Sequence, residues 1–434
     1  MTTDADQWWE APVAVLPVDA QVALPGSKSM TNRALVLGAL ADGPSTIHHP
    51  LDARDTRLMA AALRALGSDI RPVHDAQASW GVSPGRLPGD VAIDCGLAGT
   101  VMRFVPPIAA LAAGDVHFDG DPAARRRPVG PLLDALRQCG VRIDDGAARL
   151  PFTVHGCGSA RGGAAAIDAS RSSQFVSGLL LAAARFDQGL TVRNTGRVVP
   201  NRPHVSMTLR MLHQHGVAAS ATTSDGADSW RVEPGPITAR DWTIEPDLSN
   251  ATPFMAAALA TAGAVRFEGL GRASVQAVEP VTALIEALGG SVTVTDGSLE
   301  VAGGDVIVGG ELDLRDLGEL TPTVVALALM AESPTRIVGI DYLRGHETDR
   351  LAALAAESGR LGGDVSVTDD GLLVRPRPLH GGAWHTYDDH RMATAGAIVG
   401  LRVAGVTVQN IASTKKTFPG FAGLWRTMVD VAAA

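Results

Sequence analysis

The sequence predicts an α/β protein of two lobes, each built from three repeated α/β units around buried parallel helices. Three observations support this: the length of 434 residues, a repeat of apolar helical segments, and a second repeat of helix, glycine and strand. A chain of this length exceeds one ordinary domain. The apolar fraction of 46% is sufficient for complete cores.

Apolar helical segments recur about every 70 residues, each preceded by polar or small residues. They begin near residues 29, 98, 172, 249, 319 and 389. Because they are apolar on nearly every side, we expect each to lie buried in the centre of its lobe. Helix N-termini bind phosphates and carboxylates. If these helices point the same way, six separate motifs contribute to one anion site.

The second repeat is an outer helix, a glycine stop and a short alternating strand. Five copies are clear: ALRALGSDIRPV, ALRQCGVRIDD, MLHQHGVAAS, ALIEALGGSVTV and SGRLGGDVSV. The C-terminal FAGLWRTMVDVAA is expected as the sixth helix, with its strand supplied by the N-terminal APVAVLPV, residues 11–18. The two chain ends then belong to one lobe. A solenoid of α/β units is the alternative arrangement.

Proline and glycine favour bends near Pro25-Gly26 and Glu245-Pro246, where we expect the chain to cross between lobes. The crossings predict a continuous lobe, 27–245, and a discontinuous lobe, 1–26 plus 246–434. A cleft between two lobes is a common ligand site.

Composition narrows the function. A net charge of −9 and an aromatic fraction of 4% argue against a nucleic-acid partner. Cys95, Cys139 and Cys157 show no metal-ligand spacing, so no metal or other cofactor is expected, and so sparse a set suits a reducing cytosol. No apolar run approaches the roughly 18 residues of a membrane span, and we expect no signal peptide in the acidic start. We expect a cytoplasmic monomer without a membrane partner.

The first helix start, GSKSMTNRAL, lacks the second glycine of a phosphate-binding P-loop. Taken alone it fits a capped helix start, with Ser29 or Thr31 as the cap. Lys28 is expected to bind an anionic ligand and to have no role in the core. The other starts also carry cations and hydroxyls, which suit phosphate and carboxylate ligands.

Two carboxylates, Glu319 and Glu347, could act as base and acid. Glu347 and Arg350 are three residues apart on an expected helix start, so they share a face. For any one motif, a capped or salt-bridged surface helix is the simpler interpretation. The recurrence of such residues at one position per repeat favours a metal-free group transfer between anionic substrates.

Seven motifs in this order, GSKSMTNRAL, LAGTVMR, RRP, SSQF, HETDRL, DDHRM and KTFP, resemble the 3-phosphoshikimate 1-carboxyvinyltransferase (EPSP synthase) family along nearly the whole chain. The resemblance implies the enolpyruvyl transferase fold, an inside-out α/β barrel-like arrangement in each lobe. It also implies transfer of the enolpyruvyl group of phosphoenolpyruvate to the 5-hydroxyl of shikimate 3-phosphate, with release of phosphate. Glyphosate is the family's inhibitor.

The same resemblance assigns site residues by matched motif. For shikimate 3-phosphate it implies Lys28, Ser29, Arg33, Ser172, Ser173, Gln174, Asn201, Glu319 and His346. For phosphoenolpyruvate it implies Lys28, Gly99, Thr100, Arg127, Gln174, Arg350, Arg391 and Lys416. The implied catalytic residues are Lys28, Glu319 as the base, Glu347 as the proton donor, and His390. The discontinuous lobe is then the phosphoenolpyruvate side and the continuous lobe the shikimate 3-phosphate side.

Three positions depart from the family pattern. Asn201 stands where many members have Ser, His204 where some have Tyr, and His346 where many have Lys. A histidine is only partly charged near neutrality, so substrate binding is expected to be weaker or more pH-dependent.

Two rival functions remain at this point. UDP-N-acetylglucosamine enolpyruvyl transferase has a reactive Cys in the loop that reads DPAARRRP here, and no Cys lies between 96 and 138. The other rival is a non-catalytic anion-binding protein on the same fold.

Overall fold

The computed structural model describes residues 7–73, 78–224 and 226–433. They form two compact units, each with its own core. The continuous unit is Gly26–Glu245, and the discontinuous unit joins Met1–Pro25 to Pro246–Ala434. The inner helices of each unit all contact one another, unlike the repeats of a solenoid, which touch only their neighbours.

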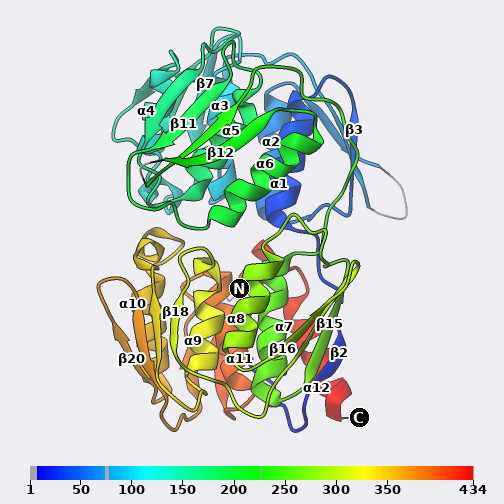
Figure 1. Cartoon of the computed structure of the whole chain (residues 1–434), viewed down its shortest axis with the longest axis vertical. Helices are drawn as coiled ribbons and strands as arrows, with labels where there is room; N and C mark the ends of the chain where they lie inside the picture. The colour runs from blue at the N-terminus through cyan, green and yellow to red at the C-terminus, as the bar shows by residue number, and fades with distance from the viewer. Residues whose placement is uncertain (1–6, 74–77, 225, 434) are drawn as a thin grey trace. The chain divides into compact units, whose positions relative to one another are not determined.

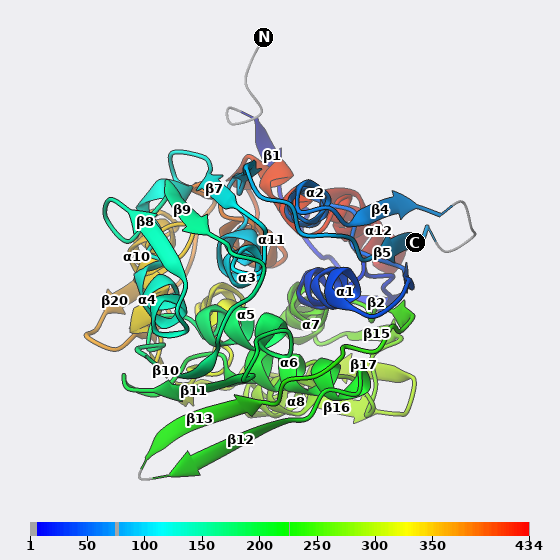
Figure 2. The same cartoon turned by 90° about the horizontal axis from the view of Figure 1, so that it is seen from above.

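The continuous unit contains three inner helices, which lie side by side in Figures 1 and 2. They are α1 (Lys28–Leu40), α3 (Gly99–Ala109) and α5 (Ser173–Ala183). In α1 every residue from Met30 to Leu40 is buried, as an all-round apolar helix requires. The outer helices are α2 (Arg54–Ala65), α4 (Gly130–Gln138) and α6 (Arg202–Gln214).

Three four-stranded sheets cover these helices. Each begins with a parallel pair and continues with two antiparallel neighbours. In spatial order, the first sheet contains β14 (Trp242–Thr243), β3 (Ser45–His48), β5 (Trp80–Ser83) and β4 (Asp69–Pro72). The second contains β6 (Val91–Asp94), β7 (Asp115–Asp119), β9 (Phe152–His155) and β8 (Arg142–Asp145). The third contains β10 (Gly163–Ile167), β11 (Leu190–Asn194), β13 (Ala227–Val232) and β12 (Ala219–Ser224).

The discontinuous unit repeats the plan. Its inner helices are α7 (Leu248–Thr261), α9 (Thr321–Ala328) and α11 (His390–Gly400), and its outer helices are α8 (Val278–Ala287), α10 (Arg350–Arg360) and α12 (Phe421–Ala433). Two four-stranded sheets have the same topology: β2 (Asp19–Gln21), β15 (Ala264–Glu268), β17 (Ser298–Ala302), β16 (Ser291–Val294); and β18 (Glu311–Asp313), β19 (Thr335–Val338), β21 (Leu372–Arg375), β20 (Asp364–Val367). The third sheet has β22 (Gly382–Trp384), β23 (Val406–Gln409) and β1 (Trp8–Glu10).

The predicted glycine stops are confirmed as helix-ending turns. Gly67 follows α2 with φ 92°, a left-handed value that favours glycine, and a Cβ there would lie 2.0 Å from the Arg86 carbonyl oxygen. A glycine with positive φ also follows α4, α6, α8 and α10.

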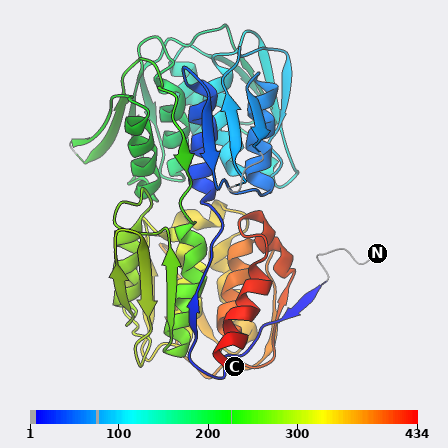
Figure 3. The ribbon, with the colours of Figure 1, turned by 90° about the vertical axis from the view of Figure 1, so that its right-hand side faces the viewer.

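The N-terminal strand prediction is wrong in its position. Residues 11–18 form no strand; β1 lies just before them and β2 just after, and they join two different sheets. Pro12 and Pro17 lack the N–H that a strand ladder needs. Figure 3 shows this blue N-terminal segment beside the red α12, so both chain ends do belong to one unit.

Side-chain contacts at both ends show that the inner helices of each unit run parallel. At the C-terminal ends, Arg185 after α5 donates to the Leu40 carbonyl of α1 at 2.7 Å. Arg402 after α11 likewise donates to the Ala260 carbonyl of α7 at 2.5 Å. A guanidinium thus meets the partial negative charge where helix C-termini converge. The N-terminal ends meet at the opposite side, where the polar residues lie.

Candidate active site

The starts of α1 and α5 are each capped by a serine that precedes the helix. Ser27 Oγ accepts from Met30 N at 3.5 Å, and Ser172 Oγ accepts from Gln174 N at 3.2 Å. The expected caps of α1, Ser29 and Thr31, are wrong: both lie inside the helix, and Thr31 Oγ1 donates back to the Ser27 carbonyl at 2.8 Å. The Ser29 hydroxyl therefore does not cap the helix.

Lys28 has a structural partner that we did not expect. Its Nζ lies 3.5 Å from Asp55 Oδ2, and the Asp55 side chain is only 4% exposed. Asp55 sits in the first turn of α2, where the helix dipole favours a carboxylate. Lys28 thus neutralises a buried charge in addition to any anion that it binds. The sequence gives no signal for Asp55, because its burial depends on how α2 packs.

Arg33 is held almost entirely by the protein. It donates from Nε to Thr208 Oγ1 (2.8 Å), from Nη1 to the Ser29 carbonyl (2.9 Å), and from Nη2 to Ser177 Oγ (3.3 Å) and the His204 carbonyl (3.0 Å). Burial lowers the pKa of Arg33 to about 9, so it remains a cation near neutrality. A guanidinium has five N–H donors, so one is left for a ligand.

The start of α3 gathers two arginines around a glycine. Arg103 Nη1 donates to the Gly99 carbonyl at 3.1 Å, and Arg127 Nη1 donates to the Leu97 carbonyl at 3.3 Å. A Cβ on Gly99 would lie 3.0 Å from Arg103 Nη1 and 3.1 Å from both terminal nitrogens of Arg127. Arg125, by contrast, pairs with Asp119 and is exposed. Arg127, unlike Arg125, is thus directed toward the start of α3.

Asn32 joins the starts of α1 and α3, since its Nδ2 donates to Thr100 Oγ1 at 2.9 Å. Sequence reasoning missed Asn32, although an amide within a fully buried helix is a signal that could have identified it. Several buried polar atoms near the helix starts of this unit have no hydrogen-bond partner among the described residues, including Asn32 Oδ1, Arg127 Nε, Gln174 Oε1 and Asn201 Oδ1. Buried polar atoms normally have a hydrogen-bond partner, so a ligand or water at these positions would complete their bonding.

Asn201 precedes α6 with φ 52° and ψ 44°. Asparagine tolerates this left-handed conformation better than most residues, which suits it to this position. Ser173 is buried at the start of α5, with an exposed fraction of 3%. The sequence-predicted residues of the continuous unit therefore lie at the N-terminal ends of α1, α3, α5 and α6.

In the discontinuous unit, the starts of the three inner helices are also linked. Ser249 Oγ of α7 donates to Glu319 Oε1 at 2.7 Å. Arg391 of α11 donates from Nη1 to the Ser249 carbonyl at 3.1 Å, and its Nη2 lies 3.6 Å from Glu319 Oε2. The short helix η3 (Gly318–Leu320) carries Glu319 just before α9. The candidate base is thus held between a hydroxyl and a cation.

A second cluster surrounds Glu347, which precedes α10 rather than lying on it. Lys416 Nζ, at the end of η5 (Ile411–Lys416), bonds Glu347 Oε1 at 2.9 Å, and Arg350 Nη2 lies 3.3 Å from Glu347 Oε2. Arg350 also forms two bonds to the fully buried Asp389, at 2.8 and 3.1 Å. Burial alone would lower the pKa of Arg350, but Asp389 and Glu347 raise it above its usual range.

His346 and His390 border this cluster. His346 Nδ1 lies 4.0 Å from Glu347 Oε2, and His390 Nδ1 lies 3.7 Å from Asp389 Oδ1. His390 is 5% exposed at the first position of α11. The structure thus brings Glu347, Arg350, Lys416 and both histidines together within one unit.

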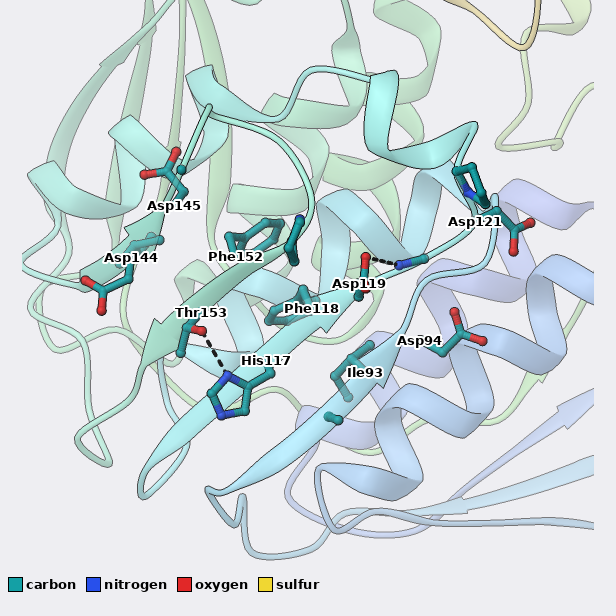
Figure 4. A pocket seen from close by; sticks show the side chains of 16 residues that line it. Ile93, Asp94, His117, Phe118, Asp119, Asp121, Asp144, Asp145, Phe152 and Thr153 are labelled. Carbon is teal, nitrogen blue, oxygen red and sulfur yellow. Dashed lines mark hydrogen bonds between the residues drawn. The ribbon is translucent and has the colours of Figure 1, made fainter.

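One pocket of the continuous unit lies away from these helix starts. A pocket of about 1070 Å³ opens at the β6–β9 sheet and is lined by several aspartates, among them Asp94, Asp119 and Asp121 (Figure 4). Asp119 and Asp121 already pair with arginines. An acidic lining does not suit a phosphorylated substrate, so the helix starts remain the candidate site.

Neither a membrane-spanning helix nor a metal-ligand cluster is found in the described part of the chain: its helices are too short or too polar to span a bilayer, and it has no group of three or more His, Cys, Asp or Glu placed to hold an ion.

Solved structures share this fold. EPSP synthase from Acinetobacter baumannii has a TM-score of 0.79 at 23% identity, covering 97% of this chain and 97% of that one. The enolpyruvyl transferase NikO from Streptomyces tendae has a TM-score of 0.75 at 19% identity, again covering 97% of both chains. These similarities establish the enolpyruvyl transferase fold.

The family follows from the sequence match. The family model of EPSP synthase (3-phosphoshikimate 1-carboxyvinyltransferase) matches residues 14–425, which is nearly the whole chain. The activity of this family is enolpyruvyl transfer from phosphoenolpyruvate to shikimate 3-phosphate in the shikimate pathway. The chain belongs to the EPSP synthase family.

Proposed function

We propose that the polar residues at the helix starts carry out this transfer. Shikimate 3-phosphate is bound by Lys28, Ser29, Arg33, Ser172, Ser173, Gln174, Asn201, Glu319 and His346. Phosphoenolpyruvate is bound by Lys28, Gly99, Thr100, Arg127, Gln174, Arg350, Arg391 and Lys416. The observation that supports this most strongly is that two carboxylates, Glu319 and Glu347, each lie next to a cation that suits an anionic substrate.

Glu319 is the proposed base. It removes the proton of the 5-hydroxyl while that oxygen bonds to C2 of phosphoenolpyruvate. Ser249 and Arg391 hold its two oxygens, which fixes the carboxylate in direction. Arg391 also favours the ionised form, which is the form that a base requires.

Glu347 is the proposed acid, which donates a proton to C3 as C2 accepts the hydroxyl. Lys416 and Arg350 favour its ionised form before the substrate binds. When the phosphate and carboxylate of phosphoenolpyruvate bind Lys416 and Arg350, these cations stabilise the Glu347 carboxylate less. A larger fraction of Glu347 is then protonated. In the elimination step, the bond from C2 to the phosphate oxygen breaks and C3 returns its proton to the same groups.

Three finer properties belong to the same proposal. Glyphosate inhibits by occupying the phosphoenolpyruvate site beside Gly99, where no side chain stands in its way. The enzyme acts in the cytoplasm, which agrees with the three free cysteines, two of them buried. It acts as a monomer, which light scattering of the purified protein would test.

The direct test is a phosphate-release assay with phosphoenolpyruvate and shikimate 3-phosphate, repeated over the neutral pH range. Release that requires both substrates is expected. A parallel reaction with UDP-N-acetylglucosamine as acceptor examines the rival transferase. Folded protein that releases no phosphate with shikimate 3-phosphate at any pH would refute the proposed reaction and favour a non-catalytic anion-binding role.

A further inference from the structure

Glu357 is a buried carboxylate on α10 that no step of the proposed reaction uses. Its side chain has no exposed surface, yet it accepts four hydrogen bonds. Oε2 accepts from His385 N at 2.9 Å and from His385 Nδ1 at 3.0 Å. Oε1 accepts from Tyr387 Oη at 2.6 Å and from Arg360 Nε at 3.3 Å. A buried carboxylate is costly unless its oxygens are satisfied, and here the donors come mainly from one short segment.

That segment leads directly into the start of α11. Tyr387 and Asp388 follow each other with φ values of 54° and 55°, the left-handed region that non-glycine residues rarely adopt. Such a conformation persists only where its surroundings hold it. Asp389 comes next as the cap of α11, followed by the site residues His390 and Arg391.

Helix α10 holds this segment at two points. Arg350 bonds Asp389, and Glu357 bonds His385 and Tyr387. Residues 350 and 357 are seven apart, which is nearly two helical turns, so both face the segment from the same side of α10.

The strained segment is also linked to η5. Asp388 Oδ1 accepts from Asn410 Nδ2 at 2.9 Å, and η5 begins just after Asn410. The far end of η5 carries Lys416, which bonds Glu347. A shift of residues 387–388 would therefore displace both the start of α11 and Lys416, the cation beside the candidate acid Glu347.

We propose that Glu357 is a positioning residue: by holding His385 and Tyr387, it maintains the left-handed turn at 387–388 and so fixes the direction of His390 and Arg391. It touches no substrate itself. Burial of the hydroxyl, together with its bond to Glu357, raises the pKa of Tyr387 to about 12, so the hydroxyl remains a donor at ordinary pH. The effect on catalysis rests on the proposed function, in which Arg391 binds phosphoenolpyruvate.

Two variants remove the contacts in steps. Glu357→Ala removes all four hydrogen bonds, whereas Tyr387→Phe removes one and leaves the buried carboxylate in place. Glu357→Gln is the conservative variant, because an amide can accept from His385 N and donate to the Tyr387 oxygen. Arg360→Met is the control within the cluster, since Arg360 is largely exposed and only one contact is lost. Glu279→Gln on α8 controls for loss of an exposed charge.

The kinetic measurement separates positioning from simple destabilisation. For Glu357→Ala we expect the KM for phosphoenolpyruvate to rise about tenfold and the KM for shikimate 3-phosphate to change less than about threefold. Tyr387→Phe should show a smaller change in the same direction, and Glu357→Gln should recover part of the loss. Loss of thermal stability with both KM values unchanged would mean that Glu357 is structural only, and would overturn the proposal.

A second measurement does not depend on activity. Hydrogen exchange of the backbone at 386–392 should become faster in Tyr387→Phe and in Glu357→Ala, and should stay unchanged in both controls and at the start of α7. Unchanged exchange at 386–392 in Tyr387→Phe, which keeps the buried carboxylate in place, would refute the proposal even if Glu357→Ala does not fold. Absence of phosphate release by the unmodified enzyme would instead refute the proposed function, while the exchange result would still decide whether Glu357 holds the segment.

Discussion

Replacing Arg350 with Met should destabilise the discontinuous unit through Asp389. The Arg350 side chain is 3% exposed and that of Asp389 has no exposed surface, so the variant leaves a buried carboxylate without its cation. Breaking such a pair from one side costs about 3–5 kcal/mol. Asp389 keeps its bond from Arg391 N at 2.9 Å and its place at a helix N-terminus, and Glu347 keeps Lys416.

Because Asp389 and Glu347 keep these partners, the expected loss of unfolding free energy is at the lower end of that range, at about 3 kcal/mol. For a unit of this size, each kcal/mol lowers the Tm by about 2–4 °C, so the shift should be roughly 6–12 °C. Calorimetry and urea unfolding measure it, and the transition that moves should be that of the discontinuous unit.

The double variant Arg350→Met with Asp389→Asn provides the decisive comparison. It removes the orphaned charge while an amide oxygen can still cap α11, so it should regain about 1–2 kcal/mol relative to Arg350→Met alone. A loss below about 1 kcal/mol in Arg350→Met, or simple additivity of the two changes, would show that the pair is not a buried unit and would refute the reasoning.

Three further changes test the proposed roles. Lys28→Met should abolish phosphate release and, because Asp55 loses its cation, also lower the Tm slightly; near-normal turnover would exclude Lys28 from the site. Glu319→Gln should lower kcat by about 10²–10⁴ with KM values nearly unchanged, and wild-type turnover would remove it as the base. Gly99→Ala places a methyl group 3.0–3.1 Å from Arg103 and Arg127, so it should weaken the binding of glyphosate more than that of phosphoenolpyruvate. Equal inhibition of the variant and the unmodified enzyme by glyphosate would contradict the placement of the inhibitor beside Gly99.

Much of the fold could be predicted from local patterns. The inner helices α1, α3, α5, α7, α9 and α11 coincide with the six apolar segments, because burial on every side requires apolar residues at nearly every position. The glycine stops were equally visible, since a left-handed helix end strongly favours glycine. The N-terminal strand was misplaced because the sixth repeat required a strand and the apolar segment 11–18 was assigned to it, although its two prolines exclude regular pairing.

The sequence names candidate site residues but does not indicate the bonds between them. Motif order placed Lys28, Glu347, Arg350 and Lys416 among the functional residues, and the structure brings the last three together. It did not indicate that Arg33 is almost fully used by protein partners, which are as distant in sequence as Thr208.

The sequence by itself determined the six repeats, the family and the kinds of residue at each helix start, because these follow from periodicity and local order. Only the tertiary structure decided which charges are buried and what they hold. Lys28 meets Asp55 across 27 residues, and Glu357 meets Tyr387 across 30. Such pairs form where helices and turns pack together, and no local spacing in the chain records them.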